Sequence, residues 1–113
     1  MLIAKEFTFD AAHKLNDYDG LCANLHGHTY KLQVVVKGRV RKSGMVIDFA
    51  DLKSLVSKKV LLKLDHSYLN ETIPQPTAEN ISIWIWKQLK KEIPLHEIKL
   101  WETPSSFVSY FGS

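Results

Sequence analysis

One short segment, Cys22-Ala23-Asn24-Leu25-His26-Gly27-His28, contains the only cysteine and two of the five histidines of this 113-residue chain. It runs directly into the alternating segment Tyr30-Lys31-Leu32-Gln33-Val34-Val35-Val36. Alternation of apolar and polar residues is typical of a β-strand with one buried face. We therefore predict a strand from about residue 25 to residue 38, with both histidines at its start.

The two histidines of this strand share a face with its apolar residues. Side chains on a strand point to the same side at every second position, so His26 and His28 lie on the side of Tyr30, Leu32 and Val34. A buried imidazole without a hydrogen-bonding partner costs free energy. Metal ligation is one good way to satisfy such a pair.

The length and composition are those of one globular domain, residues 1–113, that is large enough to form a hydrophobic core. No apolar run approaches the ~20 residues that span a bilayer, and the amino terminus lacks the features of a signal peptide. A single cysteine cannot form an internal disulfide, which fits a reducing compartment. We expect a cytoplasmic protein without a membrane partner.

The net charge of +3 is a mild basic excess. A nucleic-acid-binding domain would show a denser basic face with exposed aromatic residues, so we expect no nucleic-acid partner. Solvated lysines on helices and turns account for most of these charges, and the functional alternative is a basic rim that holds an anionic small substrate. The basic residues gather in two places, Lys37, Arg39, Arg41 and Lys42 around one turn and Lys58, Lys59 and Lys63 on an expected helix.

The periodicity of the chain predicts an α+β domain with the element order ββααββ. Each expected helix follows a capping residue, Asp48 or Thr77. The expected architecture is a four-stranded, mainly antiparallel sheet with two helices on one face. Two further apolar residues on the second helix, Ile83 and Trp86, indicate a subunit interface. The expected strands cover residues 2–12, 25–38, 97–102 and 107–111, the helices cover 49–62 and 78–92, and a short extended piece covers 45–47.

His13 closes the first expected strand and strengthens the metal hypothesis. If the first two strands are antiparallel neighbours, His13 lies opposite His26 and His28, and three imidazoles surround one point. Three neutral histidines are the ligand set of a catalytic zinc, which keeps a fourth position for water or substrate. Bound zinc lowers the pKa of its water to roughly 7 or polarises a substrate oxygen. On spacing alone, the alternative is core or loop histidines with separate partners.

Cys22 allows three interpretations. It is a fourth zinc ligand that closes the site, an inert small hydrophobic residue, or a thiolate that acts as a base or nucleophile near the metal. Spacing does not separate them.

Asp65 and His66 directly follow the first expected helix. The simple interpretation is a histidine favoured by the helix dipole next to a loop aspartate. The functional interpretation is a histidine polarised by a carboxylate, which is a common proton-transfer unit.

Glu102 shares a face with Ile98 and Leu100 by alternation, and therefore points to the apolar side of its strand. A buried carboxylate needs a cationic or strongly donating partner. A ligand with two adjacent N–H donors, such as a pterin or guanine, matches a carboxylate in bidentate fashion, and Thr103 offers a hydroxyl beside it. The alternative is a strand-end glutamate paired with an arginine or lysine.

Together these residues resemble the 6-pyruvoyltetrahydropterin synthase family and its bacterial relatives, the 6-carboxy-5,6,7,8-tetrahydropterin synthases of queuosine biosynthesis. The similarity spans nearly the whole chain, and the motifs stand in the family's order. The three-residue gap between Cys22 and His26 is similar to that of the bacterial carboxytetrahydropterin enzymes, whereas the animal pyruvoyl enzymes have a longer gap. The motifs are Phe9-Asp10-Ala11-Ala12-His13, Cys22-x-x-x-His26-Gly27-His28, Val46-Ile47-Asp48-Phe49, Leu64-Asp65-His66, Leu69-Asn70, Pro76-Thr77-Ala78-Glu79-Asn80 and Glu102-Thr103.

The resemblance implies a role for each candidate residue. It implies a tunnelling fold (T-fold), in which subunits join their sheets into a barrel with active sites between subunits, and a homo-oligomer, expected as a hexamer. The implied zinc ligands are His13, His26 and His28. Cys22 is implied as the catalytic base, Asp65 and His66 as a proton relay, and Glu102 with Thr103 as the pterin-binding residues.

The implied reaction starts from 7,8-dihydroneopterin triphosphate. Zinc binds the side-chain hydroxyls and acidifies the adjacent C–H while Cys22 removes a proton; triphosphate leaves, and carbon–carbon cleavage yields 6-carboxy-5,6,7,8-tetrahydropterin and acetaldehyde. One alternative within the family is the pyruvoyl synthase, which stops after triphosphate elimination. Two alternatives of other classes are a non-enzymatic binding module stabilised by zinc and a nucleic-acid binder, whose affinity would depend strongly on salt.

Overall fold

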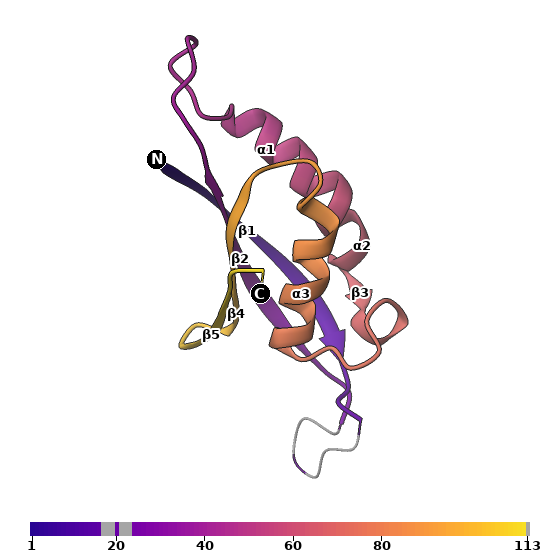
Figure 1. Cartoon of the computed structure of the whole chain (residues 1–113). Coiled ribbons are helices and arrows are strands. Elements are labelled where there is room, and N and C mark those ends of the chain that lie inside the picture. Colours follow the sequence, from indigo (N-terminus) through magenta and orange to yellow (C-terminus); the bar gives the residue numbers. More distant parts are fainter. Residues whose placement is uncertain (17–19, 21–23, 113) are drawn as a thin grey trace.

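The computed structural model describes residues 1–16, 20 and 24–112, and its centre is a twisted sheet of five strands. The two longest strands, β1 (Leu2–His13) and β2 (His26–Lys37), form an antiparallel pair over their whole length (Figure 1). Along the other side of β2 lies β4 (Leu95–Thr103), followed by β5 (Ser106–Tyr110), both antiparallel to their neighbours. The expected fold class and the strand pairing are confirmed.

The predicted alternation of β2 is present in the structure. Tyr30, Leu32 and Val34 are fully buried on the face that His26 and His28 share, and Ile98 and Leu100 of β4 are fully buried as well. All helices cover this face of the sheet, so the hydrophobic core lies between the sheet and the helices (Figure 1).

Two helical segments form the second layer. The first is a continuous rod of α1 (Phe49–Val56), a π-helical turn (Ser57–Leu61) and α2 (Leu62–Leu64), and the second is α3 (Ala78–Leu89). Both predicted caps are present. Asp48 Oδ1 accepts a hydrogen bond from Ala50 N at 2.8 Å, and Thr77 Oγ1 accepts one from Asn80 N at 3.1 Å. In the part of the chain that the structure describes, no helix is both long and apolar enough to cross a bilayer.

The sheet has one strand more than the four that the sequence predicted. After α2 the chain turns back to the end of β1, where β3 (Ser67–Tyr68) pairs in parallel with Ala11 and Ala12. The sheet order is therefore β3-β1-β2-β4-β5. A two-residue strand is too short for apolar alternation to show it. The extended piece expected at 45–47 is not a strand but part of a turn, in which Arg41 N donates to Met45 O at 3.1 Å.

The C-terminal segment covers part of the apolar surface that the sequence assigned to an interface. Trp86 of α3 contacts the Tyr110 ring of β5 edge to face, with ring centroids 5.5 Å apart. Gly112 follows with φ of +85°, and a Cβ atom at that position would lie 2.3 Å from the Trp86 ring. Trp86 is therefore partly buried by contacts within its own chain, and the expected interface at Ile83 and Trp86 stays a prediction.

Candidate metal centre and ligand cavity

The three predicted histidines converge at one end of the long strand pair. His13 is the last residue of β1 and His26 the first of β2, and the antiparallel register places them directly opposite each other. His28 lies on the same face two residues along β2, opposite Ala11. His13 is fully buried, and one ligand atom from each ring lies within 4.8 Å of the others. Strand register therefore builds this cluster, as the sequence predicted.

Backbone carbonyls fix which nitrogen of two of the rings carries the proton. His13 Nδ1 lies 2.7 Å from Pro76 O, and His26 Nδ1 lies 2.7 Å from Asn24 O. A carbonyl oxygen only accepts, so each Nδ1 must be the donor. In the neutral rings the lone pairs are then on the Nε2 atoms, which face each other at 2.9 Å.

Two lone pairs at this distance repel each other unless a cation lies against them. The third ring also lacks a partner, because His28 Nε2 is buried and has no hydrogen-bond partner among the described residues. Burial lowers the pKa of His28, and the neighbouring His13 and His26 act in the same direction, whereas Glu102 opposes them. A neutral imidazole is the form that ligates a metal, so the donor set fits a metal ion.

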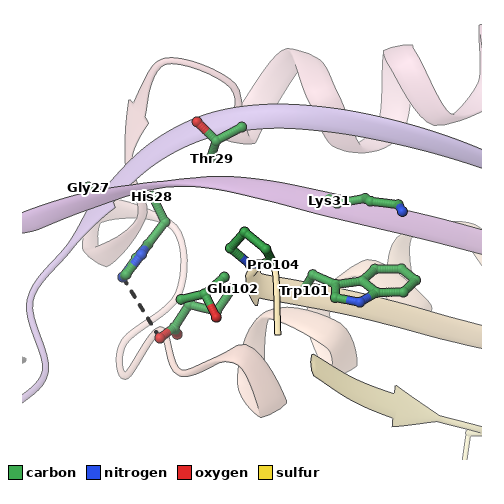
Figure 2. A pocket seen from close by; sticks show the side chains of 8 residues that line it. Gly27, His28, Thr29, Lys31, Trp101, Glu102 and Pro104 are labelled. Carbon is green, nitrogen blue, oxygen red and sulfur yellow. Dashed lines mark ion pairs between the residues drawn. The ribbon is translucent and has the colours of Figure 1, made fainter. Parts of the chain in front are cut away.

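Glu102 lies beside this cluster on β4. Its Oε1 atom is 3.8 Å from His28 Nε2, and its side chain is 27% exposed (Figure 2). Among the described residues its carboxylate lies within ion-pair distance of His28, which is charged only when it is protonated, and of no lysine or arginine. The sequence prediction that Glu102 points to the apolar side is therefore confirmed, and the alternative of a lysine or arginine partner is not what the structure shows.

A cavity of about 560 Å³ opens next to His28 and Glu102 (Figure 2). The pairing of β2 with β4 starts at Lys31 and Trp101, and the cavity lies where the two strands run on beyond that pair. Its size is within the usual range for a small-molecule site. The lining residues are Gly27, His28, Thr29, Lys31, Trp101, Glu102, Thr103 and Pro104.

Asp65 and His66 lie on the far side of β1, next to β3. Asp65 Oδ2 is 3.1 Å from His66 Nδ1, and Asp65 Oδ1 accepts a hydrogen bond from Asp10 N at 3.0 Å. The bond from Asp10 N lowers the pKa of Asp65, and His66 adds to this effect. His66 has a φ of 57° and lines a second, shallower cavity together with His28. The aspartate and the histidine do contact each other, as the sequence indicated, but they do not line the cavity of Glu102.

Cys22 lies outside the described residues, so its three interpretations stay open.

The sequence did not predict all contributors to the site. The carbonyls of Pro76 and Asn24 orient two of the imidazoles, and backbone groups leave no mark in a sequence. The alternation of Lys31 and Trp101 with the buried residues of their strands indicates that both lie on the opposite face of the sheet. Their contact with each other also depends on the register between β2 and β4, which the sequence does not show.

The sheet, the helices on one face and the histidine cluster define a tunnelling-fold protein with three histidines whose donor set fits a metal ion. The model of the 6-pyruvoyl tetrahydropterin synthase family matches residues 2–113, and the chain belongs to this family.

Known relatives agree with this assignment over nearly the whole chain. The 6-carboxy-5,6,7,8-tetrahydropterin synthase of Haemophilus influenzae is 43% identical, with 96% of each chain covered. The dihydroneopterin monophosphate aldolase of Pyrococcus furiosus is also 43% identical, over 84% of this chain and 83% of its own. The structure of Caenorhabditis elegans 6-pyruvoyl tetrahydropterin synthase superposes with a TM-score of 0.90 at 30% identity, covering 100% of this chain and 96% of that one.

Proposed function

We propose that this protein is a zinc-dependent lyase that converts 7,8-dihydroneopterin triphosphate to 6-carboxy-5,6,7,8-tetrahydropterin, acetaldehyde and triphosphate. The observation that carries the proposal is the convergence of three imidazoles, two with Nε2 lone pairs fixed by backbone carbonyls, beside a carboxylate in a ligand-sized cavity. The similarity to the Haemophilus influenzae carboxytetrahydropterin synthase over 96% of each chain supports the choice of product.

His13, His26 and His28 would hold the metal. Zinc is the natural candidate for three neutral imidazoles with an open position. Bound there, it would supply a Lewis acid for the hydroxyl oxygens of the substrate side chain.

Glu102 would bind the pterin ring. A carboxylate accepts two parallel hydrogen bonds from the 2-amino group and the adjacent ring N–H of a pterin, and Thr103 lines the same cavity. The absence of a lysine or arginine partner among the described residues leaves the carboxylate available for these donors.

Cys22 would remove the proton from the side-chain carbon, and Asp65 with His66 would relay protons. Loss of the 3′-triphosphate after proton removal at C2′ leaves an enol, which becomes a ketone at C2′. Transfer of the two hydrogens of the C1′ alcohol to the N5=C6 bond of the dihydropterin ring then gives a tetrahydropterin with a pyruvoyl side chain. Water then cleaves the bond between the two carbonyl carbons of this side chain. The carbon attached to the ring becomes the carboxyl group, and the other carbonyl carbon leaves with its methyl group as acetaldehyde. The exposed position of Asp65 and His66 makes them accessible to a second subunit.

We also propose that the chain acts as a homo-oligomer, with a hexamer as the expected form. β5 is an edge strand of the sheet and carries the exposed Phe107, and no described element covers the face of the sheet opposite the helices. An edge strand of a sheet is a template for pairing with another chain. Its sheet can therefore continue into a neighbouring subunit.

A second candidate reaction follows from the Pyrococcus furiosus relative, an aldolase for dihydroneopterin monophosphate at the same 43% identity. The same site would then cleave the side chain directly, without loss of phosphate. The product would be a hydroxymethylpterin and a two-carbon aldehyde that keeps its phosphate.

One experiment separates these reactions. Zinc-loaded protein is incubated with dihydroneopterin triphosphate or monophosphate, and the products are identified by mass spectrometry. Carboxytetrahydropterin with acetaldehyde supports the proposal, a pyruvoyl product indicates the shorter reaction, and a phosphorylated two-carbon aldehyde indicates the aldolase. Absence of any product from either substrate would contradict an enzymatic function and favour a zinc-stabilised binding module.

A further inference from the structure

Among the residues that the structure describes, a single lysine lines the cavity beside the candidate metal centre. Lys31 is the only lysine or arginine among the described residues that line it. The basic clusters noted in the sequence lie elsewhere: Arg39 and Arg41 line a different cavity, and Lys58 lies on the π-helical turn. Within the described part of this chain, none of the clustered basic residues lines the cavity of Glu102.

Lys31 is positioned by the pairing of its strand. It stands opposite Trp101 in the β2–β4 register, and its Nζ lies 4.5 Å from the centre of the Trp101 ring. Lys99, two residues before Trp101 on the same face, places its Nζ 5.7 Å from that ring. Two ammonium groups thus flank one indole, which holds their stems in place through cation–π contacts.

The charge of Lys31 is only weakly compensated. Its Nζ forms an ion pair with Glu6 Oε1 at 3.4 Å, and both side chains are more than 40% exposed. Exposed pairs of this kind are weak, because water and salt screen them. A phosphate carries more charge than a carboxylate and has more acceptor oxygens, so it can displace Glu6 from Lys31. Glu6 also accepts a hydrogen bond from Gln33 at 3.0 Å, which gives it a partner when Lys31 leaves.

We infer that Lys31, backed by Trp101 and Lys99, binds the phosphate chain of the substrate and makes the site select phosphorylated over unphosphorylated dihydroneopterin. This inference rests on the proposed function, in which the cavity takes a phosphorylated dihydropterin. Glu102 and Lys31 line the same cavity, so one ligand can meet a carboxylate that accepts from its ring and an ammonium group that donates to its phosphates (Figure 2).

The test compares four variants at fixed ionic strength. Lys31→Met removes the charge but keeps an apolar stem, Lys31→Arg keeps the charge, and Glu6→Gln frees Lys31 from its carboxylate. Lys37→Met is the matched control, because Lys37 is an exposed lysine at the other end of β2 on the same face. For each, the Kd values of inorganic tripolyphosphate and of unphosphorylated dihydroneopterin are measured by calorimetry, along with the zinc content and the melting temperature.

We expect the loss of the Lys31 charge to change the affinity for one ligand only, tripolyphosphate. Lys31→Met should raise the Kd of tripolyphosphate about tenfold, because one charge-assisted hydrogen bond is lost. The Kd of dihydroneopterin should not change. Lys31→Arg should retain the affinity and Glu6→Gln should improve it, while Lys37→Met should bind both ligands like the unmodified protein. In turnover of the phosphorylated substrate, Lys31→Met should raise KM more than it lowers kcat.

Equal tripolyphosphate affinities of folded Lys31→Met and Lys37→Met would overturn the inference. The two proposals fail in different ways. If dihydroneopterin binds but the Kd of tripolyphosphate does not change in Lys31→Met, the inference is wrong and the proposed function stands. If the Kd of tripolyphosphate rises in Lys31→Met but no dihydropterin binds, the proposed function is wrong and the anion site remains.

Discussion

His13 Nε2 and His26 Nε2 lie 2.9 Å apart, and each ring already donates its Nδ1–H to a backbone carbonyl. The two lone pairs can be satisfied together by one shared cation, and a metal ion also satisfies the buried His28 Nε2. A metal ion held by this cluster would link folding to metal binding, because it would bind the native arrangement and not the unfolded chain.

The purified protein should carry about one zinc per chain, the value for a single three-histidine site. His26→Ala or His28→Ala should remove both the metal and the activity. Elemental analysis of each variant measures the metal directly. The control is His96→Ala, because His96 lies on β4 and packs its ring against Phe111, away from the cluster. Full zinc retention in a variant that lacks all three clustered histidines would refute the site.

Zinc should also stabilise the fold. At a free zinc concentration 100 times its Kd, linkage adds about 2.7 kcal/mol to the free energy of unfolding. Urea titrations with zinc and with a chelator measure this difference. It should vanish in His26→Ala, and an undiminished difference in that variant would place the bound metal elsewhere.

Glu102→Gln should weaken the binding of a dihydropterin at least tenfold. The amide keeps the shape but presents an N–H where a ligand donor must be accepted, and ~1.4 kcal/mol corresponds to a factor of ten. Zinc content should stay the same. Glu97→Gln is the control, since Glu97 is on the same strand but outside the residues that line the cavity. Unaltered affinity in folded, zinc-loaded Glu102→Gln would reduce Glu102 to an ordinary strand-end charge.

Cys22→Ala distinguishes a base from a ligand. If Cys22 is the base, the variant should keep its zinc and its dihydropterin affinity and lose roughly 10²–10⁴-fold in turnover. Metal analysis and single-turnover kinetics on the same preparation give both values. A large loss of zinc instead would identify the thiolate as a fourth ligand and favour a structural site.

Asp65 should make the stability depend on pH in the acid range. Its pKa is below the usual 3.8 because Asp10 N donates to its carboxylate, so the native state favours the charged form. The contribution is present above pH 3.8 and is lost as the pH falls through the lowered pKa. The unmodified protein should therefore be more stable than Asp65→Asn at pH 6, and the difference should narrow toward pH 3. Urea titrations at the two pH values check this, and a difference that widens on acidification would contradict it.

The sequence predicted the long strands and the position of the histidines, because alternation sets the face of each side chain. His26, His28 and Glu102 could be placed on the buried side by parity alone, and the pairing of His13 with His26 needed only an antiparallel neighbour. Three features escaped prediction for physical reasons. β3 is too short for a period, Trp86 packs against a chain end distant in sequence, and the contact of Lys31 with Trp101 depends on a register that the sequence does not show.

Trp101 is placed to report ligand binding through its intrinsic fluorescence. It lines the cavity, whereas the other two tryptophans, Trp84 and Trp86, lie on α3. A pterin that enters the cavity comes close to one indole of the three, and the ring of a pterin absorbs in the range where indole emits. Binding should therefore quench only part of the intrinsic fluorescence, and Trp101→Phe should abolish that part. The dihydropterin affinities discussed above thus become measurable without a labelled substrate.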